Sequence, residues 1–233
     1  MKKVIVLNHK SYLKYGDIKN YPIEINDYIR NDQIVIICPS NIYIPYFKGK
    51  YNFKLGSQNI EYENITGELT GEVLKSMDVR YTLIGTNDRK NTKEENINKK
   101  VKEAINNNIR PIVVIGESFY EKELNKTAIT INRQIKDYLK DIEVKQDIII
   151  CYSPNWSYKG KQIPSNTYIT EVIELIKNII KRKYDVNIKV IYGGNITKEN
   201  IIELDKIPNL DGYLIEELSI YVKDIKQILN TIE

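Results

Sequence analysis

The sequence is poor in the side chains that bind transition metals. It has one histidine and two cysteines among 233 residues. Cys38 and Cys151 lie far apart, each in an apolar, strand-like run. Sites with nitrogen and sulfur ligands usually need three or four such side chains, so we expect no metal and no other cofactor. Two cysteines of this kind are typical of a reducing compartment, which predicts a cytoplasmic protein.

Long hydrophobic runs are also lacking. No stretch approaches the roughly 18 apolar residues that a membrane-crossing helix needs. The start, MKKVIVLN, has a basic end, but its apolar run is only about five residues, shorter than a signal-peptide core. No small-residue cleavage site follows. We expect no membrane segment and interpret this run as a buried first strand.

A concentrated basic surface is the third absence. There are 35 Lys and Arg against 31 Asp and Glu, a net charge of +4, and the lysines are scattered. Proteins that bind nucleic acid usually gather basic residues on one face. The segment KRKY at 181–184 follows an amphipathic pattern, at a place where basic residues favour the end of a helix. We therefore expect no nucleic-acid partner.

What the sequence does contain is a regular series of eight short apolar runs. Most of them are rich in β-branched residues and almost continuously apolar, which is typical of strands buried on both faces of a parallel sheet. The runs cover residues 4–8, 34–38, 53–58, 81–85, 111–116, 147–153, 188–194 and 210–216.

Helical patterns lie between most of these runs. They cover residues 94–107, 166–183, 197–207 and 222–232. The third opens with Thr197 and has Asn200 three residues later, a partial capping arrangement. Residues 41–51 contain Pro45, which predicts a short helix at best.

Eight strand–helix units predict one (β/α)₈ barrel (TIM barrel) domain over residues 1–233. The alternative is an open doubly wound sheet, but no G-x-G-x-x-G follows the first strand. In such barrels the functional residues lie at the C-terminal ends of the strands. Those ends fall at residues 8–10, 59, 85–89, 116–117, 153–156, 193–195 and 216–217.

Seven short motifs occur at these strand ends or in the loops after them. They are NHK at 8–10, QNIEYENITGELTGE at 58–72, GTNDRK at 85–90, IGE at 115–117, YSPNW at 152–156, YGGN at 192–195 and DGYLIEELSI at 211–220. In this order, along nearly the whole chain, they resemble the triosephosphate isomerase family. The resemblance implies the interconversion of glyceraldehyde 3-phosphate and dihydroxyacetone phosphate.

The departures from the family pattern are concentrated at the positions of the catalytic residues. By the resemblance, the catalytic positions are Lys10, Thr86 and Ser153, where the family has a lysine, a histidine and a glutamate base. A serine is no base near pH 7 without an activating partner, and a threonine cannot relay protons as an imidazole does. Since one acid–base group is worth about 10² to 10⁴ in rate, we expect little or no isomerase activity.

The anion site and the lid differ as well. The family holds phosphate with backbone N–H groups around a Gly-Gly pair, and this chain has Glu216-Glu217 there. Two carboxylates would repel a phosphate dianion. The lid is one residue shorter than the family's; its residues by resemblance are Pro154, Trp156, Lys159, Gly160 and Lys161.

Other family positions survive. The candidate ligand-binding residues at the barrel mouth are Asn8, Lys10, Gly193, Gly194, Asn195, Glu216 and Glu217. The loop at 58–72 keeps Gln58, Asn59, Gly67, Thr70, Gly71 and Glu72. In the family this loop packs into a neighbouring subunit, so the resemblance implies a homodimer with a small-molecule ligand at the barrel mouth.

The expected contacts follow from barrel geometry. Strand eight closes beside strand one, so we expect Glu216 or Glu217 to reach Lys10. An internal ion pair in a silent site is the favoured interpretation, and a new acid–base pair is the alternative. His9 should point outward and pack against the helices, because side chains alternate along a strand.

Five residues are interpreted as structural. Asp88 and Arg89 are expected to brace the turn after strand four, and Glu117 to be a turn or cap residue like Glu72. Trp156 is expected to anchor the lid at its hinge.

Three functions stay open. The first is a non-catalytic member of the family, a dimeric scaffold or binding protein. The second is an enzyme with changed chemistry, which uses Glu216 or Glu217 with Lys10 on a neutral or cationic substrate. The third is a weak but genuine triosephosphate isomerase.

Overall fold

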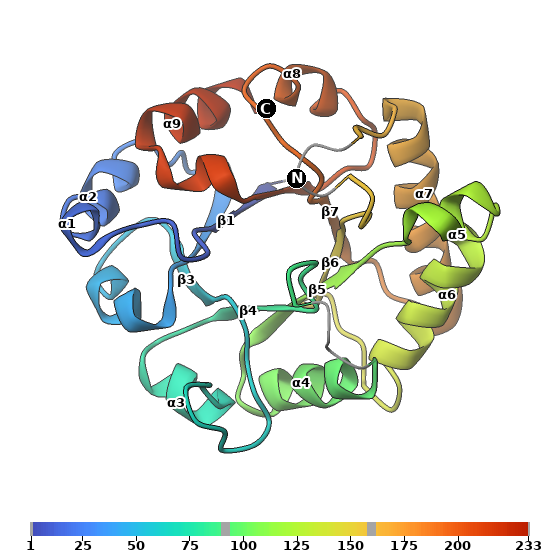
Figure 1. Ribbon diagram of the computed structural model, residues 1–233, viewed down its shortest axis with the longest axis horizontal. Helices are drawn as coiled ribbons and strands as arrows, with labels where there is room; N and C mark the ends of the chain where they lie inside the picture. Colours follow the sequence, from blue (N-terminus) through green and yellow to red (C-terminus); the bar gives the residue numbers. More distant parts are fainter. Residues whose placement is uncertain (1, 90–93, 158–161, 233) are drawn as a thin grey trace.

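Eight parallel strands close into a barrel in chain order, and helices surround it (Figure 1). The computed structural model describes residues 2–89, 94–157 and 162–232. The strands are β1 (Lys3–Asn8), β2 (Gln33–Cys38), β3 (Lys54–Ser57), β4 (Tyr81–Ile84), β5 (Arg110–Ile115), β6 (Ile149–Tyr152), β7 (Lys189–Tyr192) and β8 (Gly212–Ile215). The predicted (β/α)₈ fold is confirmed, and the open-sheet alternative is wrong.

The outer layer consists of helices of very different lengths. They are α1 (Tyr15–Ile18), α2 (Tyr21–Asn26), η1 (Asn41–Phe47), α3 (Gly71–Ser76), α4 (Glu94–Asn106), α5 (Phe119–Glu123), α6 (Thr127–Tyr138), α7 (Asn166–Tyr184), α8 (Ile201–Leu204), η3 (Glu217–Ile220) and α9 (Val222–Thr231). The long helices α4, α7 and α9 confirm the predicted patterns. In Figure 1, α1 and α2 lie across the barrel from α5, α6 and α7.

The helix predicted at 197–207 is wrong over most of its length. Thr197 and Asn200 do bond reciprocally, since each side chain accepts from the other's backbone N–H at 3.2 and 2.8 Å. This pair closes a turn, and regular helix follows only in α8. The short helix at 41–51 is the 3₁₀ helix η1, with Pro45, which has no N–H to donate, inside it.

The core has two layers because side chains alternate along each strand. Val4 and Val6 belong to the cluster inside the barrel. Ile5 and Leu7 belong to the larger cluster between strands and helices. The same alternation puts the side chain of Asn8, which follows Leu7, at the barrel mouth.

Within the described part of the chain, no helix is both long and apolar enough to cross a membrane.

The loop at 58–72 is fixed to the side of the barrel by a buried ion pair. Lys100 on α4 places its Nζ 3.0 Å from Glu61 Oε2 and 3.2 Å from Asn59 Oδ1. The Lys100 and Glu61 side chains are only 5% and 9% exposed. At the loop's other side, Arg89 bonds to Glu68 at 2.9 Å. The loop therefore has a defined shape before any partner binds.

We predict that Lys100→Met lowers the free energy of unfolding by about 3–5 kcal/mol, because Glu61 would keep a buried charge without its partner. Urea denaturation at one fixed protein concentration measures the loss. The matched control is Lys206→Met, whose ion pair with Glu203 has side chains 66% and 61% exposed. Its effect should stay within about 1 kcal/mol. Equal effects of the two variants would contradict this account of the loop.

Candidate functional site at the barrel mouth

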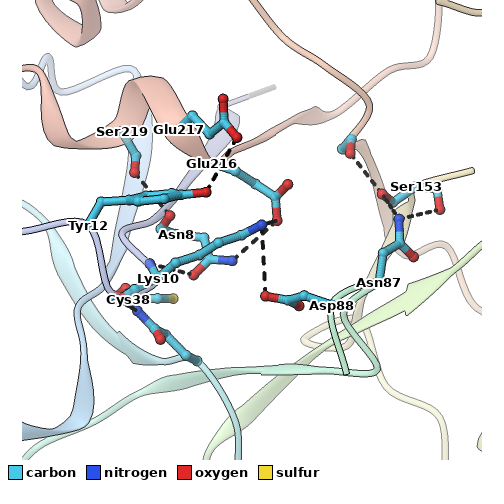
Figure 2. A network of polar contacts seen from close by, with 12 residues as sticks. Asn8, Lys10, Tyr12, Cys38, Asn87, Asp88, Ser153, Glu216, Glu217 and Ser219 are labelled. Carbon is cyan, nitrogen blue, oxygen red and sulfur yellow. Dashed lines mark hydrogen bonds and ion pairs between the residues drawn. The ribbon is translucent and has the colours of Figure 1, made fainter. Parts of the chain in front are cut away.

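Lys10 is held between two carboxylates of its own chain. Its Nζ lies 3.1 Å from Glu216 Oε1, after β8, and 3.8 Å from Asp88 Oδ2, after β4 (Figure 2). The Lys10 backbone has a φ of 46°, in the left-handed region, and its N–H donates to Asn8 Oδ1 at 3.3 Å. The loop thus aims the ammonium across the mouth. The expected contact with Lys10 is made by Glu216.

Glu216 is the carboxylate most affected by its surroundings. Burial raises its pKa, and the nearby Lys10 ammonium opposes this rise without cancelling it. Asn8 Nδ2 donates to the same oxygen at 3.5 Å. Glu217 is directed elsewhere, since it accepts from the Tyr12 hydroxyl at 3.3 Å. The two adjacent glutamates therefore have different roles.

Ser153, at the position of the family's base, is part of a structural hydrogen-bond bridge. Its Oγ donates to the Gly193 carbonyl at 2.8 Å and accepts from Asn87 Nδ2 at 3.0 Å. Figure 2 shows this group apart from the Lys10 cluster. Thr86 is buried, and its carbonyl accepts from the Arg89 N–H at 3.0 Å. Within residues 2–89, 94–157 and 162–232, the Ser153 hydroxyl forms no hydrogen bond with a carboxylate or an imidazole.

The glycines after β7 are required by close packing. A Cβ at Gly193 would lie 2.9 Å from Cys151 Sγ, and one at Gly194 would lie 2.2 Å from the Tyr192 hydroxyl oxygen. Asn195 follows with an exposed side chain. Its backbone carbonyl accepts a hydrogen bond from the side-chain amide of Asn200.

A cavity of about 520 Å³ opens beside these glycines, between the ends of β7 and β8. Gly193, Asn195, Leu214, Glu216 and Glu217 contribute to its lining. The two glutamates therefore border an open space. Lys159, Gly160 and Lys161, which the sequence analysis assigned to the lid, lie outside the described residues.

The segment after β6, where the resemblance places the lid hinge, is built around Glu117, which is fully buried. Its Oε1 accepts from Trp156 Nε1 at 2.8 Å, and from the hydroxyls of Tyr152 and Tyr168 at 3.0 Å each. The interpretation of Glu117 as a turn or cap residue is wrong. Trp156 is buried, as is Pro154 two residues before it. Three donors on one carboxylate explain how a buried acid is stabilised there.

The loop after β4 also differs from expectation. Asp88 does more than brace its turn, because it reaches Lys10, and Arg89 extends to Glu68 in the 58–72 loop. Sequence reasoning missed Asn87 and its bond to a residue 66 positions away. No spacing signal predicts such a pairing.

Gln58, at the start of the 58–72 loop, was assigned only to the dimer surface. Its Nε2 donates to the carbonyls of Lys10 and Cys38, at 2.8 and 3.0 Å. It therefore supports the backbone that carries Lys10.

The two glycines of the loop have separate structural roles. Gly67 has a φ of 83°, in the left-handed region, and Gly71 donates its N–H to Glu103. Among the described residues, no group of three or more His, Cys, Asp and Glu side chains is arranged to hold a metal.

The remaining residues of that loop lie where it joins α3. Thr70 precedes the helix without a side-chain capping bond, and Glu72 lies in the first turn. Asn59 donates to Glu68 at 2.9 Å. These contacts shape the loop.

His9 points away from the mouth, as the alternation predicts. Its ring meets those of Tyr21 and Phe47 at centroid distances of 4.6 and 5.6 Å. Both ring nitrogens are buried and have no hydrogen-bond partner among the described residues. Burial lowers the pKa of His9 from 6.5 to about 3. It is a neutral packing residue.

Comparison with known proteins gives one consistent result along the chain. A family model described as triosephosphate isomerase matches residues 3–232. The triosephosphate isomerase of Alkaliphilus oremlandii (strain OhILAs) is 32% identical over 212 residues, covering 85% of this chain and 86% of the relative. That of Alkaliphilus metalliredigens (strain QYMF) is 31% identical over 245 aligned residues, with 98% and 99% coverage. That of Wolbachia sp. subsp. Brugia malayi (strain TRS) is 30% identical over 240 aligned residues, with 100% and 99% coverage.

We predict that His9 makes the fold sensitive to mild acid. The unfolded chain binds a proton at this histidine below pH 6.5, whereas the folded chain keeps it neutral down to about pH 3. Stability therefore falls as the pH is lowered between these values, by about 2 kcal/mol at pH 5. Urea midpoints at pH 7.5 and 5 measure this loss, which should be about 2 kcal/mol smaller in His9→Phe. An identical pH dependence in the variant would exclude this role for His9.

Proposed function

The chain belongs to the triosephosphate isomerase family, and from that premise we propose that it has kept the barrel of the family and lost the isomerase reaction. The main support is the state of Lys10. Its ammonium, which the family uses on the substrate, is neutralised by Glu216 and Asp88 at 3.1 and 3.8 Å. A substrate would have to displace an internal partner before it could use this charge.

The second support is the missing proton transfer. Isomerisation of a triose phosphate needs a base that removes a proton next to a carbonyl and an acid that polarises the oxygen. The Ser153 hydroxyl donates its hydrogen bond to the Gly193 carbonyl. Thr86 offers a hydroxyl in place of an imidazole. With each acid–base group worth about 10² to 10⁴, the two losses together should lower the rate by at least about 10⁴.

The third support is the charge after β8. Glu216 and Glu217 border the cavity in which the family's Gly-Gly pair would meet a phosphate. Two unit charges about 4 Å apart repel by about 4 kcal/mol in the surroundings of a protein surface. A phosphate dianion is therefore expected to bind poorly.

One observation favours a second candidate, an enzyme with changed chemistry. The raised pKa of Glu216 is what a general base working near neutral pH requires. Lys10, at 3.1 Å, would be its partner on a neutral or cationic substrate. If the wild type converts small aldoses, ketoses or amines and Glu216→Gln abolishes that turnover, the result would favour this candidate over a silent binding protein.

We further propose that the protein acts as a homodimer in the cytoplasm. The 58–72 loop is held in shape by the buried Lys100–Glu61 pair, as a loop that inserts into a partner should be. Cys38 and Cys151 are both free and buried, which fits a reducing compartment. The partner would be a second copy of this chain, and the ligand a small molecule at the mouth.

We predict no measurable interconversion of glyceraldehyde 3-phosphate and dihydroxyacetone phosphate above the level of a Ser153→Ala variant, since the serine supplies no base. The protein must come from a host that lacks its own isomerase, because traces of that enzyme would dominate the assay. Lys10→Ala is the second control. Activity that disappears in Lys10→Ala would show that the barrel still runs the family reaction and would overturn the proposal.

We predict that sedimentation in solution gives twice the chain mass of 27.3 kDa. Lys100→Met, in which the loop loses its buried anchor, should shift the equilibrium toward the monomer. Sedimentation equilibrium over a range of concentrations separates the two states. A wild-type monomer at tens of micromolar would contradict the dimer, whatever the isomerase assay shows.

A further inference from the structure

The cavity between the ends of β7 and β8 has a surplus of negative charge. We propose that it binds a small organic cation, an ammonium or guanidinium group on a short apolar stem. This inference rests on the proposed function, because it assigns a ligand class to the mouth that no longer takes a phosphate. At about 520 Å³, the cavity lies within the usual 300–1,000 Å³ range for small-molecule sites.

The charged side chains that line the cavity are mostly carboxylates. Lys198 is a lining cation, but its Nζ lies 3.0 Å from Asp224 Oδ1, which offsets its charge. Glu216 is balanced in the same way by Lys10. Within the described residues, no ion pair is formed by two other lining carboxylates, Glu217 and Glu199, although the charge of Lys198 also acts on Glu199.

The polar partner of Glu217 is a neutral hydroxyl, since the Tyr12 hydroxyl donates to it at 3.3 Å. Glu199 lines the cavity with an exposed side chain. A carboxylate has room for more than one donor, so each retains acceptor capacity toward the cavity. A cationic donor would form a charge-assisted bond there, stronger than the bond from a hydroxyl.

The apolar part of the lining specifies the rest of the ligand. Leu214 contributes from the buried inner layer of the barrel, and Ile196 and Leu218 contribute from the two flanking segments. An alkyl stem can be buried against these side chains while its charged end meets the acidic groups. A fully hydrated inorganic cation would gain nothing from that apolar surface. The lining therefore favours an organic cation.

Three probes with the same stem isolate the effect of charge: n-butylammonium, n-butanol and monobutyl phosphate. Each is titrated into ¹⁵N-labelled wild-type protein, and the backbone amide shifts of residues 193–199 and 214–218 are followed. We expect saturable shifts in these segments with n-butylammonium, weaker binding of n-butanol, and no saturable shifts with monobutyl phosphate.

Glu217→Gln should weaken n-butylammonium by about 10-fold to 100-fold, the usual value of a hydrogen bond to a charged group. Glu217 is exposed, so this variant should fold, and circular dichroism checks that it does. The matched control is Glu123→Gln, which removes a carboxylate from α5 on another side of the barrel and should leave the affinity unchanged.

Tighter binding of monobutyl phosphate than of n-butylammonium would overturn the proposal, and so would the absence of saturable shifts with n-butylammonium. Equal affinities of wild type and Glu217→Gln would overturn it too. These outcomes are separable from failure of the proposed function, which is read from the isomerase assay. A silent barrel that binds no cation would refute the inference alone. An active isomerase that binds the cation would refute only the loss of activity.

Discussion

The ion pair between Lys10 and Glu216 is the interaction on which the character of this barrel mouth depends. It exists because β1 and β8 are neighbours in the closed barrel, so that the residues just after their ends face each other. The left-handed backbone at Lys10 turns the side chain toward this partner. Asp88 adds a second carboxylate from the end of β4. The cation in the mouth thus has an internal counter-charge.

Burial and the ion pair act in opposite directions on the pKa of Glu216. Desolvation raises the pKa of Glu216, and Lys10 pulls it back only in part. A buried ion pair contributes little net stability, but removal of one partner leaves a costly isolated charge. The pair therefore resists separation by an incoming anion. The same carboxylate that neutralises Lys10 borders the cavity and, with Glu217, makes that space favourable to cations.

The sequence predicts the architecture well and the polar contacts less well. Most of the eight runs are near-continuously apolar, which is typical of strands buried on both faces, and their regular spacing along the chain predicts all eight strands. Adjacency of β8 and β1 makes a contact of Lys10 with Glu216 or Glu217 predictable too, and the structure shows that it is Glu216. Glu117 was misinterpreted because its donors come from β6, from the hinge and from α7. Such convergence depends on how elements pack in space, which no local pattern encodes.

The most direct measurement is the affinity for dihydroxyacetone phosphate of the wild type and of Glu216→Gln, by isothermal titration calorimetry. If Glu216 is the internal partner that occupies Lys10, the wild type should show no binding at millimolar ligand. The variant should gain at least about tenfold in affinity, and Lys10→Ala in the variant should remove the gain. Binding by the wild type that Glu216→Gln leaves unchanged would contradict the account, because Lys10 would then be free for a substrate after all.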